Sequence, residues 1–336
     1  MQSPIPEARL LPRQLHQLRP QRLIRALTAI GESLFGIELL QNRDSTETLQ
    51  LAPLGTETIS KILPAKWANL IAAINEPDRS ILLTPLVVSA LRRSTSTPAS
   101  ASITQVLREA AESVIRWNNF ALRHLSLEPL ALVGWIYYRR FRRELTVSEI
   151  KIAAGEVIAG WRSHRETRVD TDTQAHALGD CVERLSACTH DSKLEFMLRR
   201  SFFFPTTVNT FLLSNEAWRD FLVTFYLSLC IRHEHASELG GTAFRVDHFE
   251  RAGDLLGDME IDDGFILRFI DTANRTGDPF ILGNLGSFLG ISRIPISGAA
   301  SDALVAACEG NIQLSKSTWT LFSINSSSCG TLIRQD

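Results

Sequence analysis

The chain has 336 residues, 44% of them hydrophobic, and its mean hydropathy is close to zero, so it is long enough for two or three packed globular units. The net charge is only −2 at pH 7, which excludes an overall field that would favour nucleic acid. The charge is uneven, because residues 1–168 carry 22 basic and 15 acidic side chains and residues 169–336 carry 13 and 22. The two halves either dock on each other or offer one basic and one acidic surface to partners.

The cysteines give no sign of a disulfide framework or a zinc site. They are odd in number, scattered, and lack the paired spacing of either kind of site: Cys181, Cys188, Cys230, Cys308 and Cys329. The sequence shows no apolar run near the roughly 18 residues of a membrane span and no recognisable leader. We therefore expect reduced thiols and a cytoplasmic protein without a membrane span.

The first predicted unit, residues 1–93, is helical. Its clearest signal is a stripe of apolar residues at steps of four and three, which predicts an amphipathic helix: Leu23, Leu27, Ile30, Leu34 and Ile37. Two shorter helices are predicted around residues 67–74 and 81–91. Residues 94–101 are small and polar with one proline, which is typical of a linker.

The second predicted unit, residues 102–169, contains a long helix and then a basic helical hairpin. Ser102 with Gln105, and Thr146 with Glu149, have the spacing of capping boxes, each of which marks a helix start. Between the two starts, a helix is predicted over residues 129–143. The hairpin has the outline of a helix-turn-helix, but its arginines lie on the first helix and few base-reading side chains lie on the second.

The third predicted unit, residues 170–336, is acidic and is organised around a central buried helix over residues 215–239. Ser214 is a plausible helix cap, and Gly240 with Gly241 supplies the stop. Residues 221–231 are apolar on nearly every side, which a surface helix cannot be. Helical patterns continue beyond, and strand is expected only in a C-terminal hairpin at residues 319–324 and 331–333. The fold class predicted is therefore all-α with several helical units.

One group of imidazoles and carboxylates is a candidate for metal binding or acid–base chemistry: His233, His235, Asp247 and His248. Residues two apart on a regular helix point about 200° apart, so His233 and His235 can share a metal only where the helix has unwound. A histidine near a helix C-terminus is also stabilised by the dipole, and Asp247 with Glu250 fits a helix cap. We therefore expect no bound metal.

A second candidate surface is the basic end of the helix predicted over residues 129–143. On a helical wheel four arginines share one face, and Tyr137, Tyr138 and Phe141 fall opposite: Arg139, Arg140, Arg142 and Arg143. Arginines in a last turn offset the negative end of the helix, and they could also brace the acidic half of the chain. We expect them to be exposed or paired, because burying them unpaired is costly.

These patterns predict a non-enzymatic cytoplasmic binding protein, an adaptor or a subunit of a larger assembly, that docks an acidic protein surface through the basic helix. No cofactor is required. Nucleic-acid association through residues 139–143 is the first alternative. A metal-assisted hydrolase that uses His233, His235 and His248 is the second. The sequence does not identify the partner or the oligomeric state.

Overall fold

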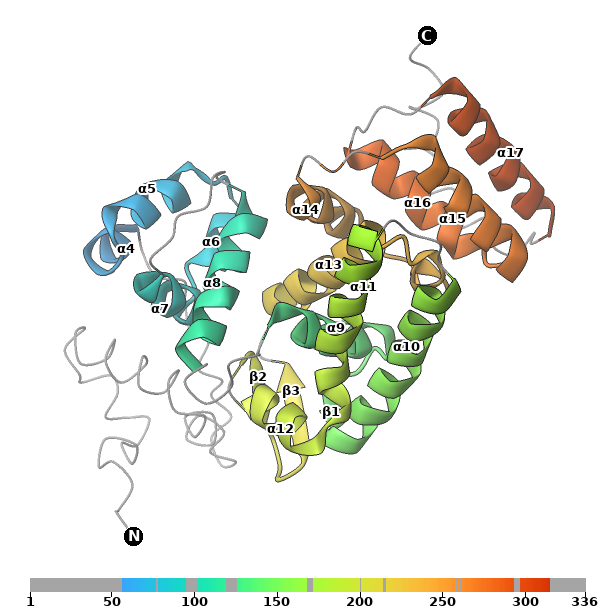
Figure 1. Ribbon diagram of the computed structural model, residues 1–336. Helices are drawn as coiled ribbons and strands as arrows, with labels where there is room; N and C mark the ends of the chain where they lie inside the picture. Colours follow the sequence, from blue (N-terminus) through green and yellow to red (C-terminus); the bar gives the residue numbers. More distant parts are fainter. Residues whose placement is uncertain are drawn as a thin grey trace. The chain divides into compact units, whose positions relative to one another are not determined.

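The computed structural model describes residues 56–76, 78–94, 102–118, 126–167, 172–199, 201–213, 216–257, 259, 261–292 and 297–314. Contacts divide the chain into two compact units, one formed by residues 1–125 and 196–212 and the other by residues 126–195 and 213–336. The described residues are predominantly helical, which confirms the all-α prediction (Figure 1). The predicted stripe at residues 23–37 and the predicted C-terminal hairpin lie outside the described residues, and the predicted boundaries at 94–101 and 169–170 stay predictions.

Before residue 125, the described part of the first unit contains five helices: α4 (Thr56–Ile62), α5 (Ala65–Ala73), α6 (Asp78–Leu82), α7 (Pro85–Arg93) and α8 (Ile103–Asn118). The helix predicted over residues 81–91 is two helices, because Pro85 begins α7 and holds Thr84 in an extended conformation. At the start of α8, the backbone N–H of Gln105 donates to Ser102 Oγ at 3.2 Å, as its capping spacing predicts. Trp67 and Leu91 are completely buried in this unit.

Three short strands form one sheet in the order β1-β3-β2: β1 (Glu144–Thr146), β2 (Phe203–Pro205) and β3 (Thr210–Leu213). Strand was not expected in this part of the chain. Pro205 has no N–H for a ladder, but β2 is an edge strand, where a missing donor is tolerated. Phe202 and Phe203 are completely buried, so the aromatic residues before Pro205 contribute to the core.

From Leu127 onward the described residues form nine helices and two short 3-10 turns besides the strands. The helices are α9 (Leu127–Arg139), α10 (Val147–Thr167), α11 (Asp172–Leu185), α12 (Asp191–Arg199), α13 (Glu216–Arg232), α14 (Val246–Leu256), α15 (Asp263–Thr276), α16 (Pro279–Ser292) and α17 (Gly298–Leu314). The 3-10 turns are Ser186–Thr189 and Ala236–Leu239. Thr146 and Glu149 form the predicted capping box at the start of α10, with bonds of 2.8 and 3.2 Å in the two directions.

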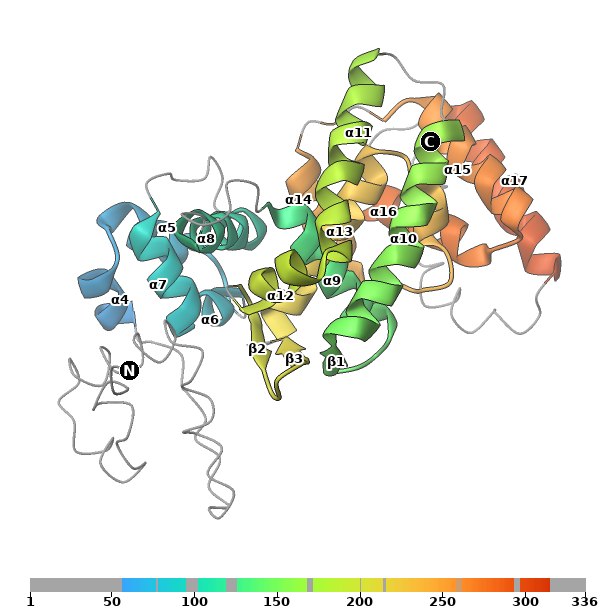
Figure 2. The same ribbon diagram turned by 60° about the horizontal axis from the view of Figure 1, so that its bottom comes forward.

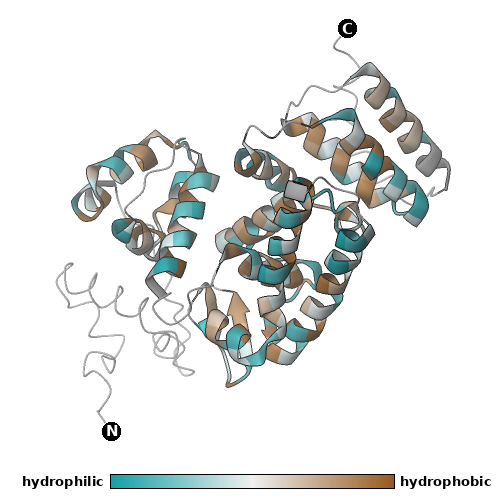
Figure 3. Cartoon of the chain, in the orientation of Figure 1, coloured by the Kyte–Doolittle hydropathy of each residue, from teal (hydrophilic) through white to brown (hydrophobic). Residues whose placement is uncertain are grey.

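Helix α13 is the centre of the second unit, and it packs against α9 and α14 (Figures 1 and 2). Its side chains from Phe221 to Ile231 are buried with the exception of Phe225, as the apolar run predicts. Gly134 allows α9 to approach closely, because a Cβ at this position would lie 2.5 Å from Leu222 Cβ. The hydropathy colouring shows hydrophilic residues interspersed with hydrophobic ones along the helices around it, as partly exposed helices require (Figure 3).

The predicted central helix over residues 215–239 is too long at its C-terminal end. Helix α13 ends at Arg232, because Glu234 adopts a left-handed conformation with φ of 55°. The backbone N–H of His235 then donates to Cys230 O at 2.8 Å, which closes the helix end. The glycine pair at 240–241 follows the next 3-10 turn, so the stop comes from a non-glycine residue that no sequence signal marked.

The segment after this turn is fixed by one side chain from α16. The buried amide of Asn284 donates to Leu239 O at 2.7 Å and to Thr242 O at 2.8 Å, and its oxygen accepts from Phe244 N at 3.4 Å. All three partners are backbone groups of the chain between α13 and α14. Asn284 therefore holds this connection against α16.

Candidate functional site

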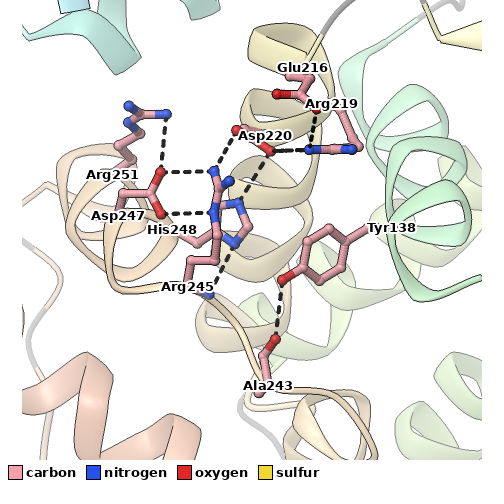
Figure 4. Close-up of polar contacts among 9 residues, drawn as sticks. All are labelled: Tyr138, Glu216, Arg219, Asp220, Ala243, Arg245, Asp247, His248 and Arg251. Carbon is pink, nitrogen blue, oxygen red and sulfur yellow. Dashed lines mark hydrogen bonds and ion pairs between the residues drawn. The ribbon is translucent and has the colours of Figure 1, made fainter. Parts of the chain in front are cut away.

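The histidine group predicted from the sequence is divided between two places. Asp247 and His248 lie in the first turn of α14, against α13 (Figure 4). His233 and His235 follow the end of α13 and lie against α10, where both rings contact Trp161. The structure therefore does not bring the three histidines of the hydrolase alternative to one centre, and that alternative stays a prediction.

The first place is an ionic cluster of four residues, Asp220, Arg245, Asp247 and His248. Figure 4 shows the Arg245 guanidinium between the two carboxylates. Its Nη2 lies 2.5 Å from Asp220 Oδ2, and its Nε and Nη2 donate to the two Asp247 oxygens at 3.1 and 2.9 Å. Asp247 therefore binds the Arg245 side chain and does not cap the N-terminus of α14. Arg245 also binds Asp220, so it connects α13 to α14.

The ionic cluster is the one group in the described part of the chain whose acid and histidine atoms lie close enough together for a metal, all within 4.8 Å of one another. Its chemistry does not favour a cation, because arginines already surround both carboxylates: Arg245 pairs with the two of them, Arg219 with Asp220 at 3.5 Å and Arg251 with Asp247 at 3.8 Å. His248 Nδ1 accepts from the backbone N–H of Arg245 at 3.4 Å, so Nε2 carries the proton and points at Asp220 Oδ1, 3.6 Å away. A metal on Nε2 would need the opposite tautomer.

Burial raises the pKa of the Asp220 carboxyl, but the hydrogen bonds of His248 and Arg245 and the charge of Arg245 outweigh burial and hold that pKa below its usual range. Asp220 therefore stays ionised and acts as a buried anchor for its neighbours. The sequence carried a signal for this residue, because Asp220 is the one acidic side chain within the buried face of α13.

The second place is a histidine–acid cluster formed by His164, His235, Tyr226, Glu238 and Trp161. The His235 ring is parallel to the His164 ring at 4.5 Å and meets the edge of Trp161 at 4.7 Å. His164 Nε2 donates to His233 O at 2.8 Å, since a carbonyl can only accept. Burial, and then the nearby imidazoles, lower the pKa of His235 well below its ordinary value, so its ring is neutral.

Glu238 completes this cluster from the 3-10 turn after α13. The indole N–H of Trp161 donates to Tyr226 Oη at 2.9 Å, and the Tyr226 hydroxyl donates to Glu238 Oε2 at 2.9 Å. Part of the Glu238 side chain reaches the surface, but burial of the carboxyl raises its pKa, against the lowering effect of the Tyr226 bond and of Arg139. Sequence reasoning missed Glu238 and Tyr226, because the contacts that define them come from α10.

A chain of aromatic rings joins the two clusters through α9. The ring centroids are 5.3, 6.0, 5.5, 6.3 and 4.7 Å apart along the order His248, Tyr138, Trp135, Tyr226, Trp161 and His235. Tyr138 also donates its hydroxyl to Ala243 O at 3.1 Å (Figure 4). The clusters are therefore separate sites that share one packed aromatic core.

The predicted basic helix is a basic turn, which we define as residues 139–143. Helix α9 ends at Arg139, Arg140 caps it, and Phe141 has a left-handed φ of 50°. The helical-wheel prediction that Phe141 lies opposite the arginines is wrong, because the helix ends before Phe141, whose side chain is 88% exposed in the turn. All four arginines are exposed, and Arg142 pairs with Glu149 at 2.9 Å.

None of the described helices is both long enough and apolar enough to cross a membrane. Comparison of the chain with models of protein families, with curated proteins and with solved structures finds no match.

Proposed function

We propose that this protein is a binding protein, an adaptor or a subunit of a larger assembly, which docks an acidic protein surface through the basic turn. The observation that carries the proposal is the exposure of Phe141 in the middle of this turn. A fully exposed Phe side chain forgoes about 1.5–3 kcal/mol of burial energy. A partner that covers Phe141 would recover this energy.

The backbone of the turn supports the same proposal. A non-glycine residue at φ of 50° costs roughly 1–2 kcal/mol, and Phe offers no local hydrogen bond in return. The turn is held in this shape from both sides, since Arg140 N donates to Ile136 O and the Arg142–Glu149 pair joins the turn to α10. The aromatic side chain is therefore presented outward by a fixed backbone.

The charges around Phe141 indicate the chemistry of the partner. Arg139, Arg140 and Arg143 form no ion pair with another residue that the structure describes. Exposed arginines around an aromatic anchor are typical of protein interfaces, in which the anchor gives affinity and the charges steer association. An acidic surface complements these charges. The scattered cysteines fit our proposal that this binding occurs in the reducing cytoplasm.

Nucleic acid is the alternative partner, because exposed arginines also bind phosphates. The geometry favours it less, since the arginines lie on a tight turn and not along a helix that could enter a groove. Lys151 is one of the few basic side chains on α10 that could bind a phosphate, and it is already paired with Asp191 at 2.8 Å.

The test is affinity capture with the full chain, followed by binding kinetics with the purified partner. We expect Phe141→Ser to speed dissociation, because it removes the anchor, and Arg140→Glu/Arg143→Glu to slow association, with the largest effect at low salt. Leu267→Ser is the matched control, since Leu267 is 49% exposed on α15 and should leave the same partner bound.

A partner whose kinetics respond to neither turn variant would contradict the proposal. Generic duplex DNA serves as the second probe in a salt titration. Duplex binding at physiological salt that weakens in the arginine variant, without any captured acidic protein, would replace the proposal with the nucleic-acid alternative.

A further inference from the structure

The histidine–acid cluster leaves one buried polar atom without a partner. His235 is 2% exposed, and its Nε2 has no hydrogen bond among the described residues, whereas its Nδ1 lies 3.1 Å from Ser237 Oγ. His164 and Trp161 fix the ring on two further sides. A buried polar atom without a partner is costly, so the position that Nε2 faces is the place to look for a ligand.

Nε2 faces Gly160 on α10, and Glu238 faces the same position. A Cβ at Gly160 would lie 3.9 Å from His235 Nε2 and 3.6 Å from Glu238 Oε1, and it would meet no closer atom. The other oxygen of Glu238 is occupied by Tyr226. Two polar atoms from the segment after α13 thus face one side of α10, and Gly160 itself is partly exposed on that side.

Glycine is an unfavourable residue at this point of a helix. Gly160 lies inside the 21-residue α10, where Ala would favour the helical conformation, and the space accepts a Cβ at ordinary van der Waals distances. Neither backbone conformation nor steric clash therefore requires glycine here. Its effect is to leave the Cβ position, 3.9 Å from Nε2 and 3.6 Å from Oε1, without a side-chain atom.

We propose that the space beside Gly160 binds a hydroxyl group of a small uncharged ligand, between His235 Nε2 and Glu238 Oε1. A hydroxyl has one proton to donate and two lone pairs to accept with, so it satisfies both groups whenever at least one of Nε2 and the Glu238 carboxyl carries a proton. The directions of the two pKa shifts support an uncharged ligand, because burial favours the neutral form of both side chains. This site is independent of the basic turn.

The experiment follows the His235 ring by NMR in the full chain labelled at histidine Cε1, with ethylene glycol and glycerol as the probes. The spectrum of His235→Gln identifies the His235 signal. In the wild-type chain we expect a shift of this signal that saturates with probe concentration. In Gly160→Ala the added methyl group fills the space, and the saturating shift should be lost.

Gly155→Ala is the matched control. Gly155 lies in the same helix and is also partly exposed, but a Cβ there meets nothing within 4 Å. Both Ala variants should raise the melting temperature by a few degrees, about the same amount, because each improves helix propensity. A saturating shift in the wild type and in Gly155→Ala alone supports the site. A wild-type His235 signal that does not respond, or one that still responds in Gly160→Ala, overturns it.

Discussion

Trp161 on α10 donates its indole N–H to the hydroxyl of Tyr226 on α13, at 2.9 Å, and the same hydroxyl donates to Glu238. One phenol oxygen therefore satisfies a buried donor and a buried acceptor at once. We expect Tyr226→Phe to lower the free energy of unfolding by about 1–3 kcal/mol, because it leaves both partners without a hydrogen bond. Urea denaturation followed by tryptophan fluorescence measures this loss.

A double variant, Tyr226→Phe with Glu238→Ala, separates the two bonds, because Ala removes the acceptor of the Tyr226 hydroxyl. If the Tyr226–Glu238 bond matters, the two changes should not add. Additive losses would contradict the network and reduce Tyr226 to a packing residue.

Glu238→Gln tests the raised pKa of this carboxyl. A carboxyl whose pKa is higher in the folded chain than its ordinary value of 4.5 disfavours the folded state increasingly as pH rises from 4.5 to the folded pKa. Gln can still accept from Tyr226 but cannot ionise. We therefore expect the variant to gain stability relative to the wild type as pH increases above 4.5. Denaturation curves at matched pH values check this, and a difference that stays constant with pH would refute the assignment.

His235→Gln tests the opposite shift. The folded chain holds His235 neutral, whereas the unfolded chain protonates it near 6.5, so stability falls as pH decreases below 6.5 and continues to fall until the folded pKa is reached. The limiting slope for one proton is about 1.4 kcal/mol per pH unit. The variant should lose this part of the slope between pH 6.5 and 5. His164 and His233 face His235, so His164→Gln is measured beside it as the control.

Asp220→Asn tests the ionic cluster at low pH. The pKa of Asp220 is below its ordinary value of 3.8, so its ionised form contributes stability above that pH and loses it as pH falls through the folded pKa. We expect the variant to lose about 1–3 kcal/mol at pH 7. The loss should shrink below pH 3.8, and a loss of equal size at pH 3 and 7 would speak against charge pairing.

Phe141→Gly tests the strain in the basic turn. Glycine adopts a φ of 50° without steric cost, so the free energy of unfolding should rise by about 0.5–1 kcal/mol even though a large side chain is removed. Phe141→Ala keeps the strain and removes the ring, and it should show no such gain. Chemical denaturation of the two variants decides between strain and packing.

The sequence was a good guide to helices and to their starts. The run of residues 221–231, apolar on nearly every side, predicted the buried helix α13. The Thr146–Glu149 spacing predicted a capping box in which both hydrogen bonds are present. These features are local, because the residues that determine them lie within a few positions of each other. The two helix ends that were wrong, at Arg139 and Arg232, are each followed within two residues by a left-handed Phe141 or Glu234. Neither residue is glycine or proline, so the sequence contains no signal for these two helix ends.

The candidate sites were less predictable, for a related reason. The sequence placed His235 and His248 in one group because they are 13 positions apart. In the structure Trp161 and His164 of α10 surround His235, and Asp220 of α13 faces His248. Contacts between residues that are distant in sequence leave no periodic pattern, so the division into two clusters follows from packing alone.

The amide of Asn284 reaches three backbone groups between Leu239 and Phe244, and this short stretch is the covalent link between the two clusters. Glu238 immediately precedes the stretch, and Arg245 immediately follows it. Because Asn284 binds the stretch near both of its ends, the same three hydrogen bonds set the positions of Glu238 and Arg245. A change in α16 would therefore be transmitted to both clusters together, although α16 supplies no residue to either of them.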